Sequence, residues 1–296
     1  MKSFLIFPFF LLLTLATGCG EGFFNQIVEI DIPEHEPVLA VSAHFKAQDS
    51  TLTVFVSHSA GILDPVILDT VVVSGAAIEV LRDGAPWQTV PSVAEGHYHQ
   101  VLGEVIGSDL HTYTLKVSVP GYEPVEAYQT MPERVDILQA EYQAQGGINS
   151  NGDKVNTLSV EFQDPAGADN YYLLEAFVHI QDTLQESFDY NLYLDSEDVL
   201  VEYHNGGLLF KDGPINGKKY TLKAYFPDNI HEFPGSALTV RLHSISRDRY
   251  LFLRTLDLYD SAQDNPFAEP VVVHDNIENG VGIFMVEAMA ERVLSF

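Results

Sequence analysis

The sequence predicts a mainly β protein built from two β-sandwich-like domains, the second of which carries one packed α-helix. Three observations lead to this prediction. From residue 38 onward, short runs rich in β-branched and aromatic residues alternate with turn signals at intervals of about 8–12 residues. The string Met131-Pro132-Glu133 divides these runs into two groups. One segment that begins at Ser246 places its apolar residues at helical spacing instead.

The N-terminus has the pattern of a secretory signal peptide. Lys2, an apolar run over 4–15 and the small residues at 16–18 precede Cys19, which is the single cysteine. The run is shorter than the roughly 20 residues that a membrane span needs. A cysteine directly after small residues resembles a bacterial lipoprotein signal, in which cleavage frees the cysteine for acylation, for example with palmitate. We therefore expect residues 1–18 to be removed, Cys19 to be lipidated and residues 19–37 to form a tether; the alternative is a secreted protein with a free cysteine.

The charge balance excludes one class of function. The chain has 42 Asp and Glu against 15 Lys and Arg, a net charge of −27, so phosphate backbones repel it and nucleic-acid binding is not expected. Anionic lipid surfaces repel it as well, so a lipid anchor rather than a basic patch must hold it at a membrane. The acidity serves either solubility or the binding of cationic partners. A hydrophobic content of 46% supports real cores.

The first group of strands predicts one sandwich over residues 38–131. The run 112–119 alternates apolar and polar residues over its length, as a half-buried strand does. Asp83-Gly84 and Pro120-Gly121 are turn signals. This pattern is typical of an immunoglobulin-like or transthyretin-like module. After a tether strand at 27–32, the expected strands are 38–45, 52–57, 71–74, 77–81, 96–101, 112–119 and 122–130.

The second group predicts a β domain over residues 132–296. Its helix, at about 246–264, has Ser246 as N-cap and an apolar stripe of Tyr250, Leu253 and Leu256, and it ends before Pro266. We interpret the stripe as core packing against the second sheet rather than as a cofactor contact. The acidic segment 181–197 is predicted to be a long loop. The expected strands are 137–143, 157–162, 171–180, 200–203, 219–226, 238–245 and 282–287.

Several strings in the second half resemble an uncharacterised family of Bacteroidota outer-membrane lipoproteins, a domain of unknown function often encoded beside TonB-dependent receptors. They are Arg241-Leu-His-Ser-Ile-Ser246, Arg249-Tyr250, Leu253-Arg254, Asn265-Pro-Phe-Ala-Glu-Pro270 and Asn276-Ile-Glu-Asn-Gly-Val-Gly-Ile-Phe284. The resemblance implies an outer-membrane lipoprotein with a β-barrel partner, and it implies no activity and no catalytic residues. Only one acid follows Cys19 closely, at Glu21, so the cell-surface and periplasmic orientations both stay open.

The motif turn at 275–282 has a structural interpretation. Asn276 and Asn279 are suited to hold a turn by side-chain-to-backbone hydrogen bonds. Gly280 and Gly282 allow a positive φ or a close approach of backbones. The alternative is an edge on which a partner docks.

Candidate chemical sites are few, and we expect no metal, no cofactor and no enzyme. His97 and His99 share a strand face, but a zinc site needs three or four ligands. The segment 149–153 lacks the glycine and the glutamate of a calcium loop, so a hairpin turn is the better interpretation. The acidic run 195–198 is interpreted as solvated. A G-x-S-x-G elbow is absent from the sequence, whereas paired carboxylates drawn from distant strands stay open.

Three functions follow as expectations. The first is a non-catalytic lipoprotein anchored in the outer membrane, an accessory or binding subunit of a TonB-dependent transporter or another β-barrel. The second is a stand-alone binder of glycan or peptide that uses exposed aromatic side chains. The third, the least favoured, is a carboxylate-dependent hydrolase. The candidate aromatic contacts are Trp87, Tyr98, Tyr190 and Tyr193.

Overall fold

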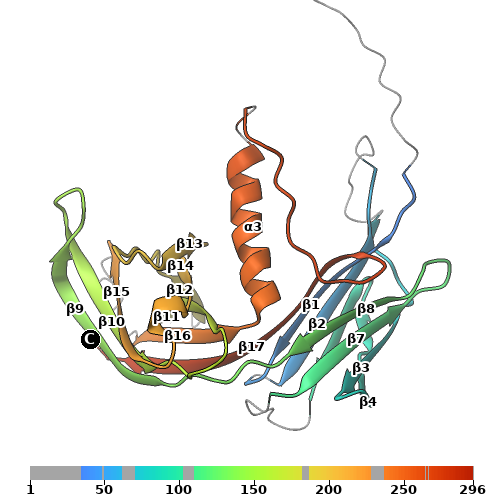
Figure 1. The fold of residues 1–296 in the computed structure, drawn as a ribbon, viewed down its shortest axis with the longest axis horizontal. Coiled ribbons are helices and arrows are strands. Elements are labelled where there is room, and N and C mark those ends of the chain that lie inside the picture. The colour runs from blue at the N-terminus through green and yellow to red at the C-terminus, as the bar shows by residue number, and fades with distance from the viewer. Residues whose placement is uncertain are drawn as a thin grey trace, which may run out of the picture. The chain divides into compact units, whose positions relative to one another are not determined.

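The computed structural model describes residues 35–48, 50–61, 71–102, 110–181, 187–227, 237–263, 265 and 267–295 (Figure 1). Strands dominate these residues, and α3 (Arg247–Gln263) is the α-helix among them, which confirms the mainly β prediction. The predicted signal peptide, Cys19 and the strand at 27–32 lie outside the described residues. No helix within the described ranges is long and apolar enough to cross a bilayer.

The described strands form three sheets. A four-stranded sheet has the order β4 (Ala85–Thr89), β3 (Ala77–Arg82), β7 (Thr112–Ser118) and β8 (Val125–Thr130). A three-stranded sheet has the order β15 (Lys219–Phe226), β10 (Lys154–Gln163) and β9 (Ile137–Ile148). A ten-stranded sheet runs in the order β13 (Val201–His204), β14 (Gly207–Lys211), β11 (Tyr171–Gln181), β16 (Ala237–Ile245), β17 (Val281–Leu294), β1 (Leu39–Lys46), β2 (Thr51–His58), β6 (His97–Val101) and β5 (Ser92–Ala94), with β12 (Ser187–Asn191) paired to β11.

The first core lies between the four-stranded sheet and one end of the ten-stranded sheet. Alternate residues of β1 are buried, as a strand with one core face requires. Phe45 meets Tyr113 edge to face at a centroid distance of 4.9 Å. Two packed sheets around this core are the sandwich-like arrangement that the sequence predicts.

The second core lies between the three-stranded sheet and the other end of the ten-stranded sheet. An aromatic cluster is at its centre, with ring centroids of Phe162, Tyr172 and Phe210 between 5.2 and 6.0 Å apart. The Tyr172 hydroxyl donates to Asp164 at 2.6 Å, which satisfies a buried polar group.

One long strand serves both cores. β17 pairs in parallel with β1 and antiparallel with β16 (Figure 1). Its Phe284 and Val286 pack in the first core, whereas Ala290 packs in the second. The predicted division between residues 131 and 132 separates most members of the two cores, but the C-terminal strand crosses it.

Helix α3 packs on the ten-stranded sheet as predicted. The Ser246 hydroxyl accepts a hydrogen bond from the Arg249 backbone N–H at 3.3 Å, so Ser246 is the N-cap. Tyr250 and Leu253 are buried against Leu173, Leu209 and Ile245 of β11, β14 and β16. These contacts form a third, smaller core cluster on the sheet face opposite the second core.

Several local predictions were wrong. The segment 181–197 is not one long loop, because residues 187–191 form β12 and add a strand to β11. Strands β4, β5 and β14, each of three to five residues, were missed. Residues 71–74 form only an isolated bridge between Val72 and Ser57. The last strand continues beyond the predicted 282–287 to Leu294 because β16 offers it a long partner.

Candidate functional site

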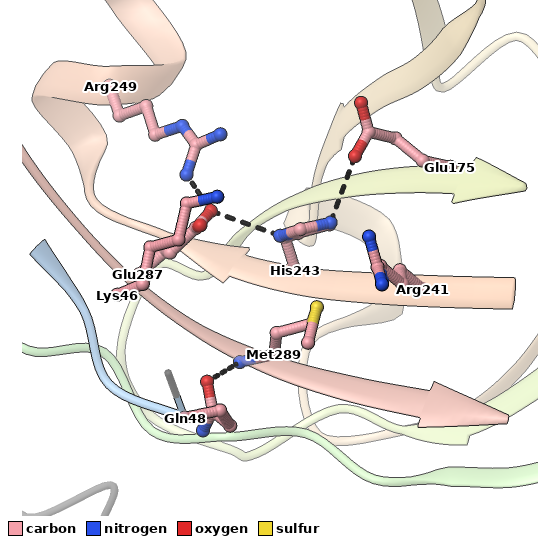
Figure 2. Close-up of a pocket in the computed structure, with 8 residues that line it drawn as sticks. All are labelled: Lys46, Gln48, Glu175, Arg241, His243, Arg249, Glu287 and Met289. Atoms are coloured by element: carbon pink, nitrogen blue, oxygen red, sulfur yellow. Dashed lines mark hydrogen bonds and ion pairs between the residues drawn. The ribbon is translucent and has the colours of Figure 1, made fainter. Parts of the chain in front are cut away.

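A polar pocket of about 270 Å³ lies where β1, β11, β16 and β17 meet the first turn of α3 (Figure 2). The alternation of side chains between the two faces of a β-strand explains which residues line the pocket. Leu238, Val240 and Leu242 of β16 point into the second core, so Arg241 and His243 point to the opposite face. The lining residues are Lys46, Gln48, Glu175, Arg241, His243, Arg249, Glu287 and Met289.

Glu287 is the centre of the pocket's ion pairs. This carboxylate is 2% exposed and sits on β17 directly opposite Lys46 of β1 and Ile245 of β16. Its Oε2 pairs with Arg249 and lies 3.0 Å from Nδ1 of His243, and its Oε1 lies 3.1 Å from Nε2 of His44. Three cationic or imidazole groups thus surround one buried carboxylate.

His243 connects this cluster to a second carboxylate. Its Nε2 lies 3.0 Å from Oε2 of Glu175, whose side chain is 45% exposed. A neutral imidazole has one N–H, so it donates to only one of its two carboxylate neighbours at a time. Figure 2 shows His243 between Glu175 on one side and the Glu287–Arg249 pair on the other.

Burial changes the proton affinities in the pocket. Desolvation lowers the pKa of the His243 imidazole, and the cations Arg249 and Lys46 add to that effect, while Glu175 opposes it. Desolvation also lowers the pKa of Arg249 to about 10, so the guanidinium stays charged at neutral pH. The contact with His243 holds the pKa of Glu175 below its ordinary value.

We expect acid to destabilise the protein through this cluster. A His243 that binds protons less readily when folded contributes stability that is lost as the pH falls below about 6.5. The lowered pKa of Glu175 also makes acid destabilising, at lower pH: the stability that Glu175 contributes is present above the ordinary glutamate pKa and is lost below it.

The groups that face His243 are Glu175, Glu287, Arg249 and Lys46. Thermal unfolding between pH 7 and 5 should show a fall in Tm, and the fall should be shallower in His243→Asn; equal slopes would contradict this role for His243.

The two carboxylates of the pocket are not arranged as an acid and a base. A glycosidase needs one carboxyl group whose pKa is raised so that it can donate a proton. In this pocket the pKa of Glu175 is shifted downward, and Glu287 is paired with a guanidinium.

The structure places the predicted aromatic contacts in different environments. Trp87 lies on β4, partly buried against Phe45 and Tyr113 of the first core. Tyr98 is 1% exposed, and its hydroxyl accepts a hydrogen bond from the Ala76 N–H at 2.8 Å, so it cannot be a surface contact. Tyr190 packs partly buried on the second core. Tyr193 alone of the four is prominently exposed, at 68%.

The motif turn has the structural role that its residues suggest. Asn276 Oδ1 accepts from the Phe284 N–H at 2.8 Å, and its Nδ2 donates to the Phe284 carbonyl at 2.9 Å. Asn279 adopts a positive φ of 62°, and Gly282 one of 121°. Gly280 lies against β1, since a Cβ there would be 2.6 Å from the Leu39 carbonyl oxygen. The turn thereby fastens β17 to β1.

The remaining candidates have ordinary structural surroundings. His97 contacts the Phe55 ring and His99 lies 3.2 Å from the Thr53 hydroxyl. The segment 149–153 is a hairpin turn as predicted, with Asn149 Oδ1 accepting two backbone N–H groups. In the acidic run, Asp195 and Asp198 accept hydrogen bonds from Tyr203 and Tyr220. No group of three or more His, Cys, Asp or Glu in the described ranges is arranged to hold a metal ion.

The sequence alone did not point to the pocket. Its residues come from four strands and a helix, and Gln48 and Met289, which share a hydrogen bond, are 241 positions apart. The only available signal was the placement of charged residues at alternate positions of an otherwise apolar strand, as at Arg241 and His243.

Comparison with known proteins gives a family but no function. Residues 26–292 match the family described as "Domain of unknown function (DUF4249)". No curated protein matches the chain.

Among solved structures, a DUF4785 family protein from Legionella pneumophila is 11% identical to this chain, with a TM-score of 0.26. The match covers 70% of this chain and 52% of that one, so this chain spans about half of its length. The collagen-binding domain of the Erysipelothrix rhusiopathiae surface protein RspB is 6% identical with a TM-score of 0.19, covering 88% and 97%. Collagen adhesin from S. aureus is 7% identical with a TM-score of 0.19, covering 86% and 95%. TM-scores this low support no conclusion about the fold or the function of this chain.

Proposed function

We propose that this chain, which belongs to the DUF4249 family, is a non-catalytic lipoprotein of the Bacteroidota outer membrane. It is anchored through Cys19 and acts as an accessory or binding subunit of a TonB-dependent transporter or a similar β-barrel. The observation that carries the proposal is the position of the chain's single cysteine, directly after an apolar run and small residues. The buried carboxylate of Glu287 is paired with Arg249 and lies against His243, which supports binding over catalysis.

Acylation and partner capture test the two halves of the proposal. The full-length protein should incorporate a radiolabelled or clickable palmitate and fractionate with the outer membrane, because two or more acyl chains give stable anchoring. Cys19→Ser should lose both properties. An unlabelled wild-type protein that stays with the membrane would overturn the lipid anchor.

The partner is tested by affinity purification from native outer membrane in mild detergent, followed by mass spectrometry. A stoichiometric β-barrel protein is the expected result. Cys19→Ser serves as the control for proteins that bind after lysis, since it lacks the lipid anchor proposed to hold the wild-type protein beside the barrel before lysis. A lipoprotein that is recovered alone from intact membranes would contradict the accessory role.

One observation favours the second candidate, a stand-alone binder of glycan or peptide. Tyr193 and Tyr203 are both exposed, at 68% and 52%, on adjacent segments. The Leu194 N–H donates to the Gly206 carbonyl at 2.8 Å, which holds the two segments together. Two exposed rings on neighbouring segments offer stacking surface for a sugar or an aromatic side chain. Binding to a glycan or peptide array that is lost in a Tyr193→Ala, Tyr203→Ala double variant would support this alternative.

A further inference from the structure

The pocket at the first turn of α3 concentrates positive charge in a strongly acidic chain. Lys46, Arg241 and Arg249 are three of only 15 Lys and Arg residues in the protein, and all three line this one cavity. A concave site with low-dielectric walls focuses such charge and attracts an anionic group. In a chain of net charge −27, cations gathered in this way indicate recognition of a negative ligand.

The cationic side chains of the pocket have hydrogen-bond donors that are not paired with the protein's own carboxylates. Arg249 is more than nine-tenths buried, and its Nε has no hydrogen-bond partner among the described residues. In the described ranges no ion pair engages Lys46, which lies opposite Glu287 on the neighbouring strand. A buried donor such as the Arg249 Nε–H is costly unless an acceptor satisfies it.

The opposite wall of the pocket offers an acceptor. Figure 2 shows Glu175 across from Arg249 and Lys46, with His243 between them. One oxygen of Glu175 faces His243 at 3.0 Å, and its half-exposed carboxylate is held ionised by that contact. An ionised carboxylate of this kind accepts hydrogen bonds from an ammonium group.

We propose that this pocket binds a small zwitterion, a ligand with a carboxylate and an ammonium group at the size of a free α-amino acid. The ligand carboxylate lies toward Lys46 and Arg249, and its ammonium group lies toward Glu175. The cavity of about 270 Å³ is at the small end of ligand pockets, which suits one amino acid rather than a longer chain. This site goes beyond the proposed function and does not depend on it, because it lies within the chain itself.

Isothermal titration of the full-length protein in detergent tests the proposal, with an equimolar mixture of the common L-amino acids as the first probe and single amino acids next. We expect saturable binding to a subset of them. N-acetylated and amidated forms of the best amino acid lack the ammonium and carboxylate charges respectively, and each should bind at least ten-fold more weakly. A tetrapeptide that binds as tightly as the free amino acid would overturn the size limit. If either modified form bound as tightly as the unmodified amino acid, the zwitterion would be overturned.

Three variants connect the binding to the pocket. Lys46→Met and Glu175→Gln should each weaken binding at least ten-fold. Neither substituted residue is part of the buried ion pair between Glu287 and Arg249. Lys154→Met is the matched control, because Lys154 is exposed at the β9–β10 hairpin and is no part of the pocket lining. Binding that is unchanged in both pocket variants, or the absence of any binding by a folded protein with a cooperative melt, would overturn the proposal. Neither outcome bears on lipidation or on the barrel partner.

Discussion

Gly282→Ala is expected to destabilise the protein by about 3 kcal/mol or more. Gly282 has a φ of 121°, which L-residues rarely adopt. A Cβ at this position would also lie 2.0 Å from the Val41 carbonyl oxygen, which belongs to the adjacent strand. The backbone of β1 cannot move away without breaking its pairing with β17. Urea unfolding followed by circular dichroism measures the loss.

Gly167→Ala separates the two causes. Gly167 has a φ of 101°, but a Cβ there would meet nothing within 4 Å. We expect it to cost only about 1 kcal/mol, the strain of the backbone alone. If both variants lost the same stability, the close approach of β1 and β17 at Gly282 would not be the cause.

Glu287→Leu is expected to destabilise the protein by about 3–5 kcal/mol. The substitution leaves the buried guanidinium of Arg249 without its carboxylate, and it removes the acceptor of His243 and the partner of His44. An uncompensated buried charge costs more than the intact pair contributes. The double variant Glu287→Leu, Arg249→Met should therefore recover part of the loss, because it removes the stranded charge as well. Denaturant midpoints of the single and double variants test this.

Glu291→Gln is the matched control on the same strand. Glu291 pairs with Arg241 at 2.8 Å, but its side chain is 39% exposed. Solvent screens such a pair, so its loss should cost less than about 1 kcal/mol. If Glu291→Gln and Glu287→Leu lost similar stability, burial would not be the reason for the large effect expected at Glu287.

The local elements of the fold were accessible from sequence. The strand at 219–226 was placed at its observed bounds, and the helix was predicted within one residue at each end, because Ser246 and the Tyr250–Leu253 stripe are signals within a single segment. The hairpin at 149–153 and the motif turn are likewise held by side chains of the same segment. β12 escaped prediction because its alternation is short and its pairing partner, β11, decides its state.

The candidate site was not accessible in the same way. The string around Trp87 left open whether its ring is exposed or caps the first sandwich, and Tyr98 was a candidate surface aromatic. In the structure Trp87 packs partly buried against the first core and Tyr98 lies within it. Burial is a property of the partner sheet and not of the local string. The buried cluster of His243, Arg249 and Glu287 joins β16, α3 and β17, and its members have no shared motif spacing.

By itself the sequence determined the mainly β class, helix α3 with its cap, the glycine-dependent turn before the last strand, and the acidity from which we expect no nucleic-acid partner. The expectation of a lipid anchor at Cys19 also comes from sequence alone. The tertiary structure decided that the last strand lies between β1 and β16 and that three scattered cations converge on one cavity. The physical reason is range: period, capping and turn chemistry act between residues a few positions apart. Strand order and ion-pair partners depend instead on packing free energy between segments that can lie far apart in the sequence, as His44 and Glu287 do.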